Sequence, residues 1–291
     1  MSGSVKKRKR QRFLFEPPKA AQGISMKVVI LAGGKGSRMI EESARKPKPM
    51  AEIGGKPIIW HIMKLYSHYG FHEFIVCCGY KGHMIKDYFL HYQMYQSDTV
   101  FDLGNRKQSF YAGDAEPWKV TLVNTGLETK TAGRILKIAD YLDEDENFML
   151  TFGDGVADVD IPKLLAFHRT GGKIVTLTAV QPAGRFGAIQ MSEEGVIRSF
   201  REKARSDQSW INAGFMVMNK KIFPYLGDGS EMMQDAPFEN MAAEGQMAAY
   251  RHEGFWAPMD TVHDQMYLEE LWDSGQAPWK VWRGVRNLLS E

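Results

Sequence analysis

The sequence of 291 residues is 44% hydrophobic, which is enough for one large α/β domain with a sizeable buried core. Its 37 lysines and arginines nearly balance 35 aspartates and glutamates, so the net charge of +2 gives no overall signature of nucleic-acid binding. No apolar run approaches the roughly 20 residues that cross a bilayer. The two cysteines, Cys77 and Cys78, are adjacent within an apolar run, which favours buried strand residues in a reducing compartment over a disulfide or a zinc site. We therefore expect a cytoplasmic protein without nucleic-acid or membrane partners.

Residues 1–25 differ in character from the rest of the chain. A basic run occupies residues 6–10, and Phe13-Leu14-Phe15 and two prolines follow it. Because no apolar stretch of about 7–15 residues follows the charges, the pattern does not predict a signal peptide. It favours a flexible basic leader or a remnant of recombinant expression. A patch for anionic surfaces or for nuclear import is the alternative.

Between residues 26 and 172, short apolar strands alternate with helical patterns. The run at 27–32 is rich in β-branched residues and ends at two glycines, as expected of a buried parallel strand. A helix expected after Pro57 has one apolar face and ends at Gly70. Further strands are expected at 74–78, 120–123 and 148–152, further helices at 81–95 and 132–142, and an irregular insertion or hairpin at 98–118. This order predicts an α/β fold with a Rossmann-like, mixed but mainly parallel sheet flanked by helices.

After residue 173 the connections between elements become shorter. Strands are expected at 174–180, 188–191, 196–200 and 214–218, and helices at 235–245 and 262–274. This pattern predicts a mixed sheet edge that forms a smaller lobe. We therefore divide one domain, residues 26–282, into halves of about 26–172 and 173–262, followed by a tail at 283–291. Trp279 and Trp282 are expected either to pack a C-terminal arm on the body or to lie in a subunit interface.

A glycine-rich segment, Gly-Gly-Lys-Gly-Ser-Arg at 33–38, directly follows the first strand. Glycines let the backbone approach a ligand closely, and successive N–H groups together with an arginine can bind phosphate oxygens. The segment is not a P-loop, because Ser-Arg follows Gly36 where that motif has Lys and then Ser or Thr. Nor is it a dinucleotide fingerprint, because Met39 occupies the position of the third glycine. An ordinary turn between a strand and a helix is the alternative.

Two further features strengthen the phosphate-binding interpretation. Lys46 and Lys48 alternate with prolines, so a restricted backbone holds two cations where they can return to the glycine-rich segment. Asp154 lies between two glycines beyond the end of a strand, at the edge where open α/β sheets bind ligands. Two aspartates are a plausible protein share of a Mg²⁺ site, because this ion prefers carboxylate and phosphate oxygens. For Asp154 alone, a turn residue is the alternative.

Several motifs together resemble the sugar-1-phosphate nucleotidyltransferase family. They are Leu-Ala-Gly-Gly-x-Gly-Ser-Arg at 31–38, Lys-Pro-Lys-Pro-Met at 46–50, Gly-Gly-Lys-Pro-Ile at 54–58, and the stretches at 60–64, 77–82, 153–158, 184–188 and 258–261. The resemblance spans Met26 to about Trp282, and most of these stretches are most similar to the members that use CTP and glucose 1-phosphate. It implies the nucleotidyltransferase fold with a smaller sugar-binding lobe, Mg²⁺ as cofactor, a homo-oligomer, and a reaction that yields CDP-glucose and pyrophosphate.

The resemblance also implies roles for individual residues. Those expected to bind the nucleotide are Leu31, Ala32, Gly33, Gly34, Gly36, Ser37, Arg38, Lys48, Thr125 and Gly126, with Arg38 and Lys48 as the catalytic pair. Those expected to bind the sugar phosphate are Gly184, Glu202, Lys203 and Asn212, and those expected to bind the metal are Asp154 and Asp260. Ser37 stands where the family usually has threonine, and both side chains carry a hydroxyl.

The charges of these residues suit the implied reaction. A sugar phosphate oxygen attacks the α-phosphorus of the nucleotide, and because this nucleophile is already an anion, no general base is required. The remaining obstacles are charge repulsion and in-line positioning, which Arg38, Lys48 and Lys203 can relieve as cations. The alternatives are a thymidylyl- or uridylyltransferase acting on a hexose 1-phosphate, and a non-catalytic regulatory homologue, which would be expected to lose these residues. The choice of base rests on the resemblance alone.

Overall fold

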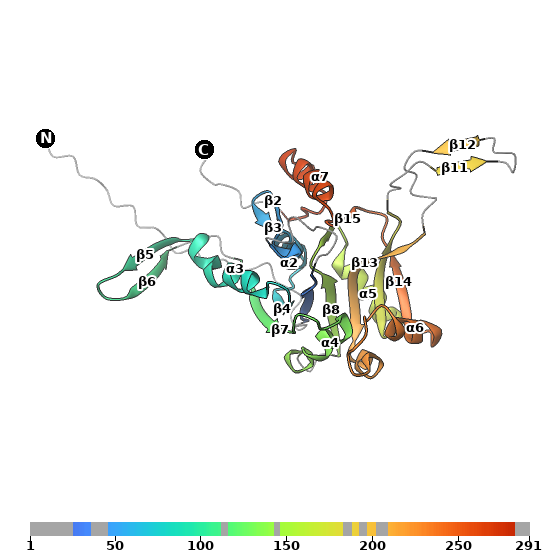
Figure 1. The fold of residues 1–291 in the computed structure, drawn as a ribbon, viewed down its shortest axis with the longest axis horizontal. Helices are drawn as coiled ribbons and strands as arrows, with labels where there is room; N and C mark the ends of the chain where they lie inside the picture. The colour runs from blue at the N-terminus through green and yellow to red at the C-terminus, as the bar shows by residue number, and fades with distance from the viewer. Residues whose placement is uncertain are drawn as a thin grey trace.

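A seven-stranded mixed sheet forms the centre of the molecule (Figure 1). The structure, a computed structural model, describes residues 26–35, 46–111, 116–142, 146–182, 188–191, 197–201 and 209–282. The central strands are β1 (Val28–Ala32), β4 (Glu73–Cys78), β7 (Lys119–Asn124), β8 (Asn147–Phe152), β10 (Val175–Val180), β13 (Ile211–Asn219) and β14 (Met247–Arg251). Their order is β14-β10-β13-β8-β1-β4-β7, and within this sheet only β13 runs antiparallel to its neighbours. The predicted mixed, mainly parallel sheet is confirmed.

Helices cover both faces of this sheet and enclose two apolar cores. On one face lie α2 (Ile58–His68), α3 (Gly82–Tyr95), α5 (Ile161–Gly171) and α7 (Val262–Asp273), and on the other lie α4 (Thr131–Leu136) and α6 (Ala236–Ala243). Short 3₁₀ helices complete the set: η1 (Lys48–Met50), η2 (Ala139–Tyr141) and η4 (Lys220–Leu226). Along β1 the side chains alternate, with Val28 and Ile30 in the first core and Val29 and Leu31 in the second. The strand is therefore buried on both faces, as its continuous apolar run predicted.

Four two-stranded sheets accompany the central one. They are β2 (Glu52–Ile53) with β3 (Lys56–Pro57), β5 (Asp98–Asp102) with β6 (Lys107–Tyr111), β9 (Gly155–Ala157) with β15 (Trp256–Pro258), and β11 (Ala188–Met191) with β12 (Ile197–Arg201). The β5–β6 pair confirms the hairpin expected within 98–118, and it projects from the body beside α3 (Figure 1). The β9–β15 pair lies close to the carboxyl end of β8, because β9 follows β8 after two residues.

The second half of the chain forms the mixed sheet edge that the sequence predicted. The strands expected at 174–180 and 214–218, β10 and β13, pair within the central sheet. Only β11 and β12 stand apart, as a two-stranded sheet of their own. Inserting the antiparallel β13 between β8 and β10 continues the core of the first half, so both halves share one sheet.

The helix expected at 132–142 is also shorter than predicted. It ends at Leu136, and the backbone leaves the helical region at Ile138, with φ −104° and ψ 4°, before the 3₁₀ turn η2. Ile138 and Leu142 are nevertheless buried, as their apolar spacing predicted. The other predicted helices and strands of the described chain occur within two residues of their expected bounds, except β13, which begins three residues earlier than expected.

The C-terminal arm packs against the body, as one of the two interpretations of its tryptophans proposed. Trp279 is 1% exposed and stacks on Phe255 and Trp272, and Trp282 meets Trp60 of α2 edge to face. Trp279 Nε1 donates to Nδ1 of the buried His61 at 3.3 Å. These contacts join the last described residues to the first long helix.

Two smaller expectations concern cysteines and membranes. Cys77 and Cys78 are free and buried on β4, and burial raises the pKa of the Cys77 thiol to about 12, so it stays protonated and unreactive near neutral pH. Within the residues that the structure describes, none of the helices combines the length and apolarity needed to cross a bilayer.

Candidate active site

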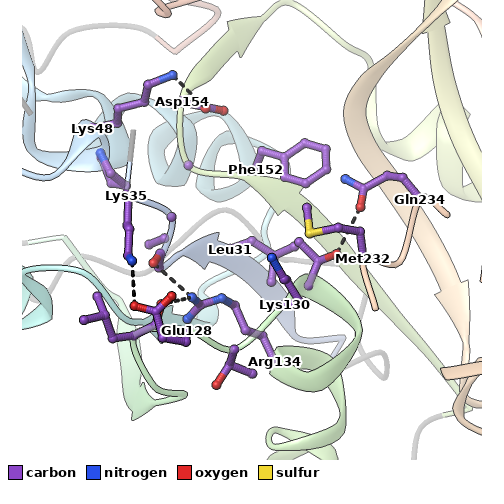
Figure 2. A pocket seen from close by; sticks show the side chains of 18 of the residues that line it. Leu31, Lys35, Lys48, Glu128, Lys130, Arg134, Phe152, Asp154, Met232 and Gln234 are labelled. Carbon is purple, nitrogen blue, oxygen red and sulfur yellow. Dashed lines mark hydrogen bonds and ion pairs between the residues drawn. The ribbon is translucent and has the colours of Figure 1, made fainter. Parts of the chain in front are cut away.

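A cavity of about 540 Å³ opens at the carboxyl ends of β1, β7 and β8 (Figure 2). Its walls consist of Leu31, Ala32, Gly33, Gly34, Lys35, Lys48, Pro49, residues 127–131, Arg134, residues 152–154, Met232, Gln234 and Asp260. The strand order reverses here, because the chain moves from β1 out to β4 and β7 and then returns to β8 on the other side of β1. Open α/β sheets bind their ligands at this kind of switch point. The volume suits a ligand the size of a nucleotide.

The turn after β1 forms the first wall of the cavity, and a buried arginine fixes its position through a hydrogen bond. Arg134 on α4 donates through Nη2 to the carbonyl oxygen of Gly33 at 3.0 Å. A Cβ at Gly33 would lie 2.0 Å from Arg134 Nη1, so any larger residue at this position would displace the guanidinium group. Tyr80 N–H also donates to Gly33 O, at 3.1 Å, from the loop after β4. Gly33 and Gly34 therefore present their backbone to the cavity from a fixed position.

The restricted lysine segment brings Lys48 into the cavity. Pro47 and Pro49 flank Lys48 in η1, and Pro49 packs on Gly153, where a Cβ would lie 3.0 Å from Pro49 Cγ. This contact places Lys48 beside the end of β8. Lys46, by contrast, does not line the cavity, since it pairs with Glu52 at 2.5 Å on the surface.

A short antiparallel pairing brings together the two predicted metal ligands, Asp154 and Asp260. Pro258 of β15 pairs with Gly155 of β9, and Met259 N–H donates to Asp154 O at 2.7 Å. Asp260, the next residue, therefore lies next to Asp154 although 105 residues separate the two in sequence. The capping box of α7 fixes the position of Asp260, because its own N–H and that of Thr261 both donate to Asp264 Oδ2.

Lys48 links the two carboxylates electrostatically. Its Nζ lies 2.5 Å from Asp260 Oδ1 and 3.7 Å from Asp154 Oδ2, and Figure 2 shows the pair with Asp154. Burial raises the pKa of the Asp154 carboxyl and the charge of Asp260 raises it further, whereas Lys48 opposes both effects. Two carboxylates are oxygen ligands of the type that Mg²⁺ prefers. Because the described residues contain no group of three metal-binding side chains, phosphate oxygens and water would have to complete the coordination shell.

Polar and charged side chains line the opposite wall. Lys35 Nζ, on the turn after β1, pairs with Glu128 Oε1 at 2.6 Å from the loop after β7 (Figure 2). Farther along, Thr131 Oγ1 donates to Gln234 Oε1 at 3.0 Å and accepts from Met233 N–H. Phe152 presents an aromatic face between this wall and Asp154. The cavity thus joins an end that carries Lys48, Asp154 and Asp260 to a wall with hydrogen-bonding groups.

The predicted residues fall into three groups. Those that line this one cavity are Leu31, Ala32, Gly33, Gly34, Lys48, Asp154 and Asp260. Those that are described but do not line it are Thr125, Gly126 and Asn212. Those that lie outside the described residues are Gly36, Ser37, Arg38, Gly184, Glu202 and Lys203. The cavity therefore unites predicted nucleotide-binding and metal-binding positions.

Thr125, Gly126 and Asn212 lie next to cavity residues. Thr125 is fully buried, donates to Cys78 O and accepts from Arg134 Nη1, while Gly126 O accepts from the same guanidinium. Asn212 lies at the start of β13, where its Oδ1 accepts from Gly214 N–H. Gly214 in turn packs on Phe152, with φ +86°. Asp158 accepts from Phe255 N–H and pairs with His252, so it braces the β15 segment.

Sequence reasoning did not identify Arg134, Lys35, Glu128 or Gln234 as residues of this site. Arg134 sits between apolar residues of a helix, where an arginine is ordinarily a solvated surface group. Its burial to 4% exposure becomes visible only in the fold. Lys35 lies within the glycine-rich segment, so its position could have signalled a role, whereas Gln234 follows no recognisable pattern.

Comparisons with known proteins agree with this fold. A family model described as nucleotidyl transferase matches residues 27–270. A protein from Salmonella typhi named glucose-1-phosphate cytidylyltransferase is 49% identical over 88% of this chain and 100% of its own length, and its counterpart from Salmonella typhimurium has the same values. Among solved structures, HddC from Yersinia pseudotuberculosis superimposes with a TM-score of 0.62 at 21% identity, covering 85% of this chain and 99% of that one. An apo UDP-glucose pyrophosphorylase gives 0.61 at 17% identity, covering 87% and 100%.

The chain belongs to the nucleotidyl transferase family. The similarity to these solved structures confirms the predicted nucleotidyltransferase fold.

Proposed function

We propose that this chain transfers a cytidylyl group from CTP to α-D-glucose 1-phosphate, giving CDP-glucose and pyrophosphate. The observation that carries the proposal is the 49% identity to glucose-1-phosphate cytidylyltransferases along their entire length, in a chain whose two predicted metal ligands and five of whose predicted nucleotide-binding residues line one cavity. Relatives named as a UTP–glucose-1-phosphate uridylyltransferase or as mannose-1-phosphate guanylyltransferase subunits are less similar, at 25–27% identity.

The cavity divides between the parts of the substrates. The backbone at 31–34 and the wall at 127–131 would bind the nucleoside. Arg134 fixes the positions of both segments, because its guanidinium donates to Gly33 O and to Leu127 O. Lys48, and Arg38 outside the described residues, would neutralise the phosphates at the reacting end. Asn212 would bind the glucose 1-phosphate together with Gly184, Glu202 and Lys203, which lie outside the described residues.

Asp154 and Asp260 would hold a magnesium ion, which when bound would neutralise charge on the triphosphate. The protein's own task is then positioning. It must hold the sugar phosphate oxygen in line with the α-phosphorus and offset the repulsion between two anions. The positive charge of Lys48, which lines the cavity, can reduce this repulsion.

The direct test is pyrophosphate release with glucose 1-phosphate and Mg²⁺, using CTP, UTP, dTTP, ATP and GTP separately. Release with CTP far above the others is the expected result. Release with another nucleotide would keep the family and overturn the choice of base. No release with any of them, when further hexose 1-phosphates are also tried, would favour a non-catalytic family member.

We also propose that the enzyme is a homo-oligomer in which the β5–β6 hairpin contacts a second copy. The hairpin exposes Val100, Phe101, Leu103, Phe110 and Tyr111, with exposed fractions from 41% to 85%. Side chains alternate between the two faces of the hairpin, so Phe101 and Phe110 lie on one face and Val100 and Tyr111 on the other. A lone hairpin is only marginally stable in water, so apolar cover on both faces would stabilise it. Replacing Phe101 and Phe110 by serine should reduce the mass measured by light scattering, and an unchanged mass would refute this interface.

A further inference from the structure

Lys48 touches both of the carboxylates that the proposed function assigns to the metal. We infer that Lys48 is the counter-ion of the Asp154–Asp260 pair in the free enzyme, and that its ammonium group and a divalent cation compete for this pair. The metal would then enter together with the nucleotide and not before it. This inference rests on the proposed function, because that function makes the two aspartates metal ligands.

The contacts place the ammonium group within reach of both carboxylates. Lys48 Nζ lies 2.5 Å from Asp260 and 3.7 Å from Asp154. The Lys48 side chain is only 11% exposed and that of Asp260 only 19%, so water screens this contact poorly. A metal ion held by the same two carboxylates would need the space beside them that Nζ now fills.

The charges make simultaneous occupancy unfavourable in the absence of a nucleotide. Two carboxylates carry two negative charges, and Lys48 already offsets one of them. A divalent ion a few ångströms from the ammonium would repel it, and the described chain offers no third acidic, histidine or cysteine ligand to favour the ion. A triphosphate changes this balance, because it brings negative oxygens that the lysine and the metal can share.

Lysine is suited to such an exchange. Its ammonium ends a flexible four-carbon stem, so Nζ can move between partners while its backbone stays fixed. Here the backbone is held by the flanking prolines and by the Ala51 N–H, which donates to Lys48 O at 3.0 Å. The alternative is a permanent Lys48–Asp260 pair that persists when the metal binds.

The chain provides a matched control in Lys46. It lies two residues from Lys48, carries the same charge, and pairs with Glu52 outside the cavity. Replacing Lys46 by methionine therefore changes the net charge of the segment without freeing Asp154 or Asp260. Any effect specific to Lys48 must come from its contact with the two aspartates.

The experiment is a titration of the nucleotide-free, full-length enzyme with Mn²⁺, in which electron paramagnetic resonance measures the free ion. Lys48→Met should tighten Mn²⁺ binding by about tenfold or more, the size of effect that a neighbouring unit charge produces, while Lys46→Met changes it by less than about twofold. Unchanged or weaker binding in Lys48→Met would overturn the inference. Equal tightening in both variants would overturn it too, since it would show only a general effect of charge.

Two further measurements separate the possible failures. Adding Asp260→Asn to Lys48→Met should abolish the tightened binding, and its persistence would show that the ion binds elsewhere. The titration contains no nucleotide and measures binding only. Its result can therefore be interpreted even if the enzyme shows no turnover with CTP. If Lys48→Met fails to fold, amine labelling of the wild-type enzyme gives the same answer. Lys48 should become more reactive when Mn²⁺ saturates the site, and constant reactivity would refute the exchange.

Discussion

The guanidinium of Arg134 donates to the carbonyl oxygen of Gly33 at 3.0 Å, and so joins helix α4 to the end of β1 across 101 residues of sequence. The same group donates to Thr125 Oγ1 at 2.5 Å and to Gly126 O at 3.0 Å. One buried side chain therefore sets the separation between the two loops that form the walls of the cavity. Burial lowers the pKa of Arg134, and the neighbouring Cys77 and Cys78 oppose this shift.

Arg134→Lys should weaken both the fold and nucleotide binding. A lysine cannot donate along several directions from one plane, and it would leave buried oxygens unpaired, at a cost of about 1.5–3 kcal/mol of unfolding free energy. Urea unfolding would measure that loss, and the KM for CTP should rise in parallel. Arg169→Lys, at an exposed position of α5, is the control and should change neither. Equal stability of Arg134→Lys and the wild type would show that the guanidinium contacts are dispensable.

Asp154→Ala should abolish turnover and leave the fold intact. The side chain keeps 38% of its surface exposed and supports no described core contact, so its removal should cost little stability. The loss in kcat should reach at least about a hundredfold at saturating Mg²⁺, as for other electrostatic groups at a reaction centre. Asp160→Ala is a useful contrast, because Asp160 caps α5 through Lys163 N–H and its loss should lower stability without lowering kcat. Wild-type turnover in Asp154→Ala would remove this residue from the mechanism.

Asp264→Ala should affect catalysis from outside the cavity. Asp264 accepts from the N–H groups of Asp260 and Thr261, so its loss frees the backbone that carries Asp260. We expect a loss of about 1 kcal/mol in unfolding free energy together with a clear fall in kcat. Asp273→Ala, at the other end of α7, should leave kcat unchanged. A fall in stability alone would mean that Asp260 keeps its position without the capping box.

The pair between Lys35 and Glu128 should influence nucleotide affinity more than stability. Both side chains are exposed, at 54% and 74%, so the pair should add at most about 0.5 kcal/mol to folding. In the free enzyme, however, we expect Glu128 to compete with incoming phosphate for Lys35. Glu128→Gln should therefore lower the KM for CTP by about two- to threefold, and it should lose this effect when Lys35 is already methionine. An equal effect of Glu128→Gln in both backgrounds would exclude competition for Lys35.

His61 should make the stability of the fold depend on pH. Burial lowers its pKa from 6.5 to about 4, and its hydrogen bonds fit a neutral ring that donates to Ile53 O and accepts from Trp279. Between these two values the unfolded chain binds more protons than the folded one, so stability is complete above pH 6.5 and falls as the pH drops toward 4. The loss between pH 7 and pH 5 should be about 2 kcal/mol. Urea unfolding at pH 7 and pH 5 measures it, and His61→Gln should remove most of the difference.

Much of the fold follows from local patterns in the sequence. The strand at 27–32 and the helix between Pro57 and Gly70 were predictable because apolar period and breaker residues agree there. The insertion of β13 between β8 and β10 was not, because strand order depends on pairing between distant segments. The early end of α4 was equally hidden, since the apolar residues beyond it are buried whether or not the helix continues.

For the site too, single motifs were predictable from the sequence, whereas contacts between distant segments were not. Lys48, Asp154 and Asp260 could be proposed because their motifs resemble a known family. Their meeting depends on the β9–β15 pairing, in which each strand has only three residues, too few for a periodic signal. Arg134 escaped prediction because an arginine in a helix is ordinarily a solvated surface group, while its partners come from loops that only the fold brings together.

The tryptophans of the C-terminal arm have a consequence for biosynthesis. Trp279 and Trp282 cover α2, which lies more than two hundred residues earlier in the chain. A nascent chain emerging from the ribosome therefore displays the apolar surface around Trp60 and His61 until translation has passed these tryptophans. During that interval molecular chaperones have a binding surface on the growing polypeptide, and a message cut short before residue 277 yields a product that keeps it exposed.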